Sequence, residues 1–288
     1  MKRQGMPSKL ATIASCVILL SVAGLAQTPK LIASADASFD RWSGTFSFSD
    51  YQGNLQVALG LYEVALPAIA PDELQTRSYV LNRLAQGYFE LGMAYLTDRD
   101  EQKAAYSKGK DYALESLRLN PMFVEAEKES FRAALSSASD VKAIFWYGNN
   151  LGRYLNFNPL TAISGGMKDV QASFERALEL DPTYLGGGPW RALGSFLAQV
   201  PPFMGGDTVQ ARAAFENAIA AAPQFLENYV DDVEYIAKPA QDWDRFCTEI
   251  GVTLDKGSDQ RTMAAWPLYN ALALKRAQDL AADHPCGN

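Results

Sequence analysis

Side chains that could carry catalysis are few in this 288-residue chain and do not form a recognisable set. The single histidine, His284, lies among the last five residues. No serine sits in a nucleophile elbow. The run GGGP at 186–189 lacks the lysine of a phosphate-binding loop and follows no predicted strand. The sequence therefore predicts no catalytic residue, no cofactor and no enzymatic activity.

Acidic residues gather at Asp231, Asp232 and Glu234, and such a group could resemble a catalytic carboxylate cluster. Acidic side chains on a helix usually point into water, because burying an unpaired charge is costly. We expect a solvated helix face here. The chain carries 33 acidic and 26 basic residues, for a net charge of −7, and has no basic patch with interleaved aromatics. This balance argues against nucleic-acid binding.

The first 26 residues predict export. Basic residues at positions 2, 3 and 9 precede an apolar run over 10–26 that ends in small residues at 24 and 26. This arrangement is typical of a cleaved signal peptide and indicates an exported protein. Lipidation at Cys16 is the less favoured alternative, since the apolar run continues beyond it.

Cys247 and Cys286 are the cysteines that remain after cleavage. An even pair in an oxidising compartment predicts a disulfide. It would close a loop of about 40 residues and stabilise the fold by roughly 3–4 kcal/mol in the chain-entropy model. Two free thiols in a reducing compartment remain the alternative. Two cysteines and one histidine are too few for a metal site.

The elements that position these residues are helices, because the chain after residue 48 follows helical periodicity almost throughout. Residues 27–48 show no clear period, and 49–288 read as one all-α domain. Three segments carry a Leu-Gly pair, at 91–92, 151–152 and 193–194. Each is followed by a helical run that ends in proline, and two of these runs share an alternation of small and large residues. Glycine lets a neighbouring helix approach closely, and proline ends the second helix.

These marks resemble the tetratricopeptide repeat, with its W-x2-LG-x2-Y, A-x3-F-x2-A and closing proline. In the usual repeat the leucine and the proline lie about 25 residues apart. Here the separations are 30, 31 and 30 residues. Each hairpin therefore carries about five extra residues, in segments such as PLTAISGGM and PPFMGGD. A closing helix pair over 226–250, broken at Pro239, is expected to follow.

The stretch YLGGGPWRALGSFLAQVPPFMGGD at 184–207 could be a catalytic loop or a packing motif, and the repeat marks favour packing. Its glycines predict a tight turn with positive φ. Pro189 is expected at a helix start, and Asp207 is expected to cap the next helix. Together with FWYGNNLGRY and ASFERALELDPTYLGGGPWRALG, this stretch resembles the TatT family, periplasmic components associated with TRAP transporters.

The resemblance implies an all-α body of stacked helical hairpins that associates as a homotrimer and contains an internal pore or pocket. It also implies docking to a TRAP-type periplasmic solute-binding protein and handling of an organic-acid or more apolar solute. A tetratricopeptide scaffold in envelope assembly, without a small ligand, is the alternative function. Service as a structural subunit of an enzyme is a third and weaker one.

The first helix of each repeat is expected to line the concave face of such a stack. Spacing of about 100° per residue then predicts which side chains share that face. Aromatics, amides and arginines of this kind suit a ligand with an apolar body and a carboxylate. The two arginines could instead pair with nearby acids such as Asp169 or Glu175. The predicted binding residues are Phe89, Trp146, Asn149, Arg153, Asn156, Arg191 and Gln199.

Overall fold

Helices make up all the regular secondary structure in the residues that the computed structural model describes, 27–40 and 46–286. The predicted all-α fold is therefore confirmed. The predicted signal segment over 1–26, including Cys16, lies outside the described residues. Among the described helices, none is both long enough and apolar enough to cross a membrane.

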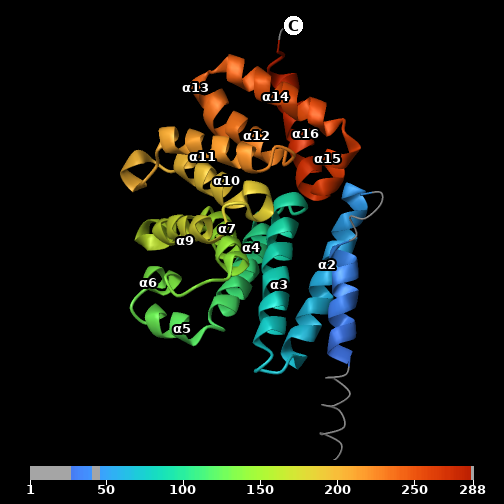
Figure 1. Ribbon diagram of the computed structural model, residues 1–288, viewed down its shortest axis with the longest axis vertical. Coiled ribbons are helices and arrows are strands. Elements are labelled where there is room, and N and C mark those ends of the chain that lie inside the picture. The colour runs from blue at the N-terminus through green and yellow to red at the C-terminus, as the bar shows by residue number, and fades with distance from the viewer. Residues whose placement is uncertain (1–26, 41–45, 287–288) are drawn as a thin grey trace, which may run out of the picture.

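The segment before the repeats is more ordered than its sequence indicates. Residues 27–39 form a helix that packs beside α2 (Phe48–Ala65) (Figure 1). Ala35 and Phe39 are fully buried, and the Tyr51 hydroxyl donates a 3.1 Å hydrogen bond to the Phe39 carbonyl oxygen. This helix buries only one narrow stripe of apolar side chains. Its sequence therefore shows only weak helical periodicity. A 3-10 turn, η1 (Leu66–Ala68), ends the pair.

Three helical hairpins follow, and consecutive hairpins pack against each other (Figure 1). In each hairpin the first helix contains the Leu-Gly pair. The second helix ends shortly before a proline. Their helices are α3 (Leu74–Ala94) with α4 (Arg99–Leu117), α7 (Val141–Leu155) with α9 (Met167–Leu180), and α10 (Tyr184–Gln199) with α11 (Thr208–Ala221).

Glycines let the two helices of each hairpin come close, as the sequence predicts. A Cβ atom at Gly92 would lie 2.8 Å from the Tyr106 ring, and one at Gly194 would lie 3.2 Å from the Phe215 ring. In the second hairpin the tight position is Gly148, four residues before the Leu-Gly glycine, where a Cβ would lie 2.8 Å from Phe174. A larger residue at these positions would require the facing ring or its helix to shift.

The GGGP stretch forms a turn at the start of α10. Gly186 and Gly187 have φ of 63° and 77°, and Leu185 joins them with φ of 46°. A Cβ at Gly186 would lie 2.2 Å from the Phe225 side chain, so glycine is required there by space as well as by backbone conformation. Regular helix resumes near Pro189, which confirms the predicted helix start.

The connections within and between hairpins are short helical turns. The insertion before α11 contains Phe203, whose side chain is 87% exposed. It ends at Asp207, whose carboxylate accepts hydrogen bonds from the backbone N–H groups of Val209 and Gln210 and caps α11 as predicted. The connecting elements are α5 (Pro121–Glu127), α6 (Phe131–Leu135), α8 (Pro159–Thr161), the π-helical turn η2 (Ala162–Gly166) and η3 (Pro202–Met204).

The C-terminal region closes the stack with further helices and a second cluster of buried apolar side chains around Val230 and Phe246. The predicted break at Pro239 occurs at Gln241, which adopts φ of 56°. The elements are α12 (Glu227–Asp232), the π-helical turn η4 (Val233–Ala237), α13 (Lys238–Ala240), α14 (Trp243–Gly257), α15 (Gln260–Ala265) and α16 (Pro267–Asp283).

Candidate functional site

A cavity of about 270 Å³ lies between α7, α9, α10 and the C-terminal helices, and we call it the central cavity. It is the point at which the first helices of all three hairpins meet. All seven predicted binding residues line it: Phe89, Trp146, Asn149, Arg153, Asn156, Arg191 and Gln199. The structure therefore brings the predicted set together. Their role in binding stays a prediction.

Aromatic rings form one wall of the central cavity. The Trp146 side chain is 1% exposed, and its ring centroid lies 5.5 Å from that of Phe89 and 4.9 Å from that of Phe145. Its indole Nε1 donates a 3.0 Å hydrogen bond to the Tyr184 hydroxyl, which fixes the plane of the ring. This wall offers a flat apolar surface that is held in place by packing.

Amide side chains also line the central cavity. The Asn149 side chain donates to the Phe145 carbonyl oxygen at 2.9 Å, and Gln199 donates to the Ser195 carbonyl oxygen at 3.0 Å. Asn156 and Gln199 are exposed, whereas Asn149 is half-buried. Each amide thus uses its N–H₂ group on its own helix or meets water, and these residues add polarity without adding charge.

The two predicted arginines differ sharply. Arg191 is 6% exposed, donates to the Asn228 side-chain oxygen at 2.8 Å, and has its Nε 3.4 Å from a Glu227 carboxylate oxygen. Its guanidinium also lies over the Phe225 ring, 4.3 Å from the centroid. Arg153 is exposed, and its side chain makes no hydrogen bond or ion pair with any described residue.

The alternative that both arginines pair with acids holds for Arg191, although its partner comes from α12. The acids that the sequence suggested are engaged elsewhere. Asp169 lies 3.4 Å from the Arg132 guanidinium, and Glu175 accepts a hydrogen bond from Gln171. The choice of partner follows from the packing of α12 against α10, which sequence spacing does not reveal.

The prediction of a solvated acidic face on α12 is wrong. Asp231 is 7% exposed and Asp232 is fully buried. Burial is possible because arginines of later helices neutralise them: Arg276 donates to Asp231 at 2.7 Å, and Arg245 donates to Asp232 at 2.6 Å. Glu234, which is half-buried, also accepts from Arg276, at 2.6 Å.

Several residues of the cavity wall were missed because they come from outside the repeats. Glu227 and Asp231 of α12 reach it, as do Tyr235 of η4 and Tyr269 of α16. A signal was present in the sequence, since acidic residues at 227, 231 and 234 are spaced to share one helix face. That spacing could have indicated a common role, but not that the face is buried.

Burial also alters two carboxyl groups of this region. It raises the pKa of Glu227, against the opposing effect of the Arg191 guanidinium. Burial likewise raises the pKa of Glu90 to about 7, although the Gln86 amide and the Tyr269 hydroxyl donate hydrogen bonds to it. Glu90 thus links α3 to α16 behind the cavity and is poised to change protonation near neutral pH.

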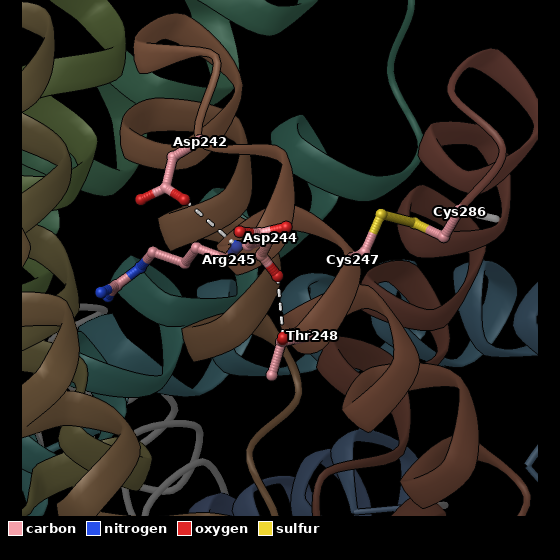
Figure 2. The surroundings of a disulfide bond; sticks show 6 residues. All are labelled: Asp242, Asp244, Arg245, Cys247, Thr248 and Cys286. Atoms are coloured by element: carbon pink, nitrogen blue, oxygen red, sulfur yellow. Dashed lines mark hydrogen bonds between the residues drawn. A yellow bond between two sulfur atoms is a disulfide. The ribbon is translucent and has the colours of Figure 1, made fainter. Parts of the chain in front are cut away.

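A disulfide joins Cys247 of α14 to Cys286 near the end of the chain, with Cα atoms 5.5 Å apart (Figure 2). The same helix carries Arg245 on another side, where Figure 2 shows it beside Asp242. His284 stacks on Trp243, with ring centroids 3.8 Å apart. The disulfide and this stacking both hold the C-terminal segment against α14.

Two comparisons with known proteins show what this chain is similar to. The chain is 30% identical over 120 residues to an uncharacterised protein of Treponema pallidum (strain Nichols), a match that covers 39% of this chain and 37% of that relative. The family model of the TRAP transporter T-component matches residues 90–285, which include every residue of the central cavity except Phe89. The protein therefore belongs to the TRAP transporter T-component family.

Proposed function

We propose that this TRAP transporter component works in the periplasm, where it docks the solute-binding protein of its uptake system and holds part of the solute in the central cavity. The observation that carries the proposal is the cavity itself. The seven predicted binding residues converge on it. They combine an aromatic wall with amides and with the Arg153 guanidinium, which pairs with no other residue in the described part of the chain.

The polarity of the cavity supports a recognition role. Ligand sites are concave and mostly apolar, with a few polar groups that fix orientation. Trp146 and Phe89 provide the apolar contact, and Arg153 provides donors that suit a carboxylate. The predicted signal segment supports export, and the family resemblance supports a homotrimer as the docking form.

Affinity purification of the exported protein from its own envelope, followed by mass spectrometry, tests the docking step. We expect a TRAP solute-binding protein to be retained after a stringent wash. Recovery of envelope-assembly proteins without any TRAP component would reject the proposal in favour of a general scaffold. The molecular mass in solution, measured by light scattering, tests the trimer.

Solute handling needs its own variant. Arg153→Ala removes an exposed cavity-lining side chain that makes no ion pair within residues 27–40 and 46–286, so the fold should be unaffected. We expect solute uptake by the TRAP system to fall while the solute-binding protein is still captured. Arg132→Ala serves as the control, since Arg132 is an exposed arginine outside the central cavity. Equal uptake by wild type and Arg153→Ala would remove the arginine from the solute site.

A further inference from the structure

A second hollow of about 350 Å³ lies beside the central cavity, and we call it the charged hollow. Its lining residues come from α12, η4 and α16 of the C-terminal region and from α3, α4 and α7 of the hairpins. Charged side chains give it a character that the aromatic wall lacks. Six residues line both spaces and make them neighbours: Met93, Arg153, Asn156, Glu227, Asp231 and Tyr235.

Three carboxylates meet two guanidiniums in this region. Arg276 contacts Glu227 at 3.6 Å, Asp231 at 2.7 Å and Glu234 at 2.6 Å. Arg191 contacts Glu227 at 3.4 Å and approaches Asp231 at 3.9 Å. With all three carboxyls ionised, this group has one negative charge in excess. A buried excess charge is unfavourable unless a further cation compensates for it.

Arg153 is the third cation of this region, and it differs from the other two because it pairs with no carboxylate of the described residues. It lines both the central cavity and the charged hollow, so it stands at their junction. Its charge acts on Glu227 through space, yet its guanidinium donates no hydrogen bond to any described residue. The group therefore reaches overall neutrality, while the five N–H donors of the Arg153 guanidinium have no acceptor among the described residues.

Charge balance selects among the ligands that could fill this space. A simple carboxylate would satisfy Arg153 but would add negative charge beside three carboxylates. A simple amine would be attracted by the carboxylates but would leave Arg153 without an acceptor. A molecule that carries both groups satisfies both sides and leaves the net charge unchanged. The aromatic wall then takes an apolar substituent, and the volume of about 270 Å³ suits a small one.

We infer that the preferred solute is a zwitterion, an amino acid with an apolar side chain. Its carboxylate pairs with Arg153, its ammonium faces Asp231 and Glu234 in the charged hollow, and its side chain lies against Trp146. This inference rests on the proposed solute site and narrows its substrate class.

Matched probes test the inference directly by titration calorimetry on the mature protein. Phenylalanine is compared with 3-phenylpropanoate, which lacks the amino group, and with 2-phenylethylamine, which lacks the carboxylate. Leucine, 4-methylpentanoate and 3-methylbutylamine form a smaller set. We expect at least one amino acid to bind ten-fold or more tightly than both of its analogues. Equal or tighter binding of the acid analogue, or no binding by any of the six, overturns the inference.

Variants assign the two ends of the ligand. Arg153→Gln should weaken binding of the amino acid about ten-fold and leave binding of the amine unchanged. Glu234→Gln should weaken binding of the amino acid and of the amine, and not that of the acid. Arg132→Gln, outside both spaces, is the control and should change nothing. An amino acid that binds Arg153→Gln as well as wild type contradicts the assignment.

The outcome is separable from that of the proposed function. Envelope purification that still captures a TRAP solute-binding protein, together with failure of all six probes, rejects the zwitterion and leaves docking intact. Binding of an amino acid without capture of any TRAP partner supports the zwitterion and rejects docking.

Discussion

The repeat hairpins and the C-terminal region are both helical, yet they fill their interiors differently. The hairpins bury rings against glycines, as Phe215 does against Gly194. The C-terminal region buries ionised groups, with Asp232 fully enclosed beside Arg245, and it adds a disulfide. The stability of the hairpins therefore depends on close packing, so a change in the volume of a core side chain should destabilise them. The stability of the C-terminal region depends on ion pairs, so removal of one partner should destabilise it.

The candidate site lies where the two regions meet. Each region contributes the kind of side chain that fills its own interior. The hairpins supply the aromatic wall around Trp146, and the C-terminal helices supply Glu227 and Asp231. A cavity between two rigid but chemically different bodies can offer apolar contact and charge recognition at once. Variants of either region therefore test whether this division of roles is real.

The largest effect is expected in the hairpin core. Phe215→Ala deletes a fully buried ring between α10 and α11 and leaves a cavity that the glycine-spaced helices cannot close. The free energy of unfolding should fall by about 3–5 kcal/mol, measured by urea denaturation. Phe203→Ala removes a ring that is 87% exposed and should change stability by less than about 0.5 kcal/mol. Similar losses for both variants would contradict the shape-based account.

Arg276 tests the contrasting claim for the C-terminal region. Arg276→Met retains much of the apolar stem but leaves the carboxylates of Glu227, Asp231 and Glu234 short of a partner. We expect a loss of about 3 kcal/mol at pH 8, measured by urea denaturation. The loss should shrink at pH 5, because the unpaired carboxyls can then take up protons.

Lys275→Met is the matched control for this variant, since Lys275 pairs with Asp279 on the exposed face of the same helix. An exposed pair of this kind contributes roughly 0–1 kcal/mol, so its loss should be small at both pH values. If Arg276→Met were as mild as Lys275→Met, the buried network would not support the C-terminal region.

The same contrast explains what the sequence could and could not predict. Local spacing determines which residues of a helix share a face, so Phe89, Trp146 and Arg153 could be placed together before any coordinates were known. The glycine notches were predictable for the same reason, apart from the use of Gly148 in the second hairpin.

The acidic and basic residues of the charged hollow could not be brought together in this way. Arg276 lies 42 residues from Glu234 in the sequence, and no periodicity connects them. Whether an acidic helix face is solvated depends on which helix later packs on it, and this is a property of the tertiary fold. The acids of α12 were therefore assigned to solvent, and the helix over 27–39 escaped notice because its buried stripe is short.

The disulfide should contribute about as much as Arg276 or somewhat less. Cys247 and Cys286 are 39 residues apart in sequence. A disulfide typically stabilises the folded state by about 2–4 kcal/mol, at or below the roughly 3–4 kcal/mol that the chain-entropy model gives for such a loop. Cys247→Ser combined with Cys286→Ser should lower stability by this amount while the hairpins keep their helical circular dichroism. Intact mass after alkylation without reductant checks the bond itself. Two alkylated thiols in the native protein would rule it out.

Glu90 gives the smallest effect and joins the two regions, because it lies on α3 and accepts a 2.8 Å hydrogen bond from Tyr269 of α16. Burial raises its pKa in the folded state to about 7, from 4.5. The folded state therefore holds this proton more tightly than the unfolded state. The associated stability is complete below about pH 4.5 and is lost as the pH rises through 7.

Between pH 5 and pH 8 the loss should be about 2–3 kcal/mol, from a shift of this size at 1.36 kcal/mol per pKa unit. Glu90→Gln keeps a neutral hydrogen-bonding group and should remove this slope from the pH profile of the unfolding free energy. Glu115→Gln, at an exposed carboxylate that pairs with Arg77, should leave the slope unchanged. Parallel profiles for wild type and Glu90→Gln would mean that Glu90 is ionised in the folded protein, and that a charged carboxylate, instead of a protonated one, ties the hairpins to the C-terminal helices.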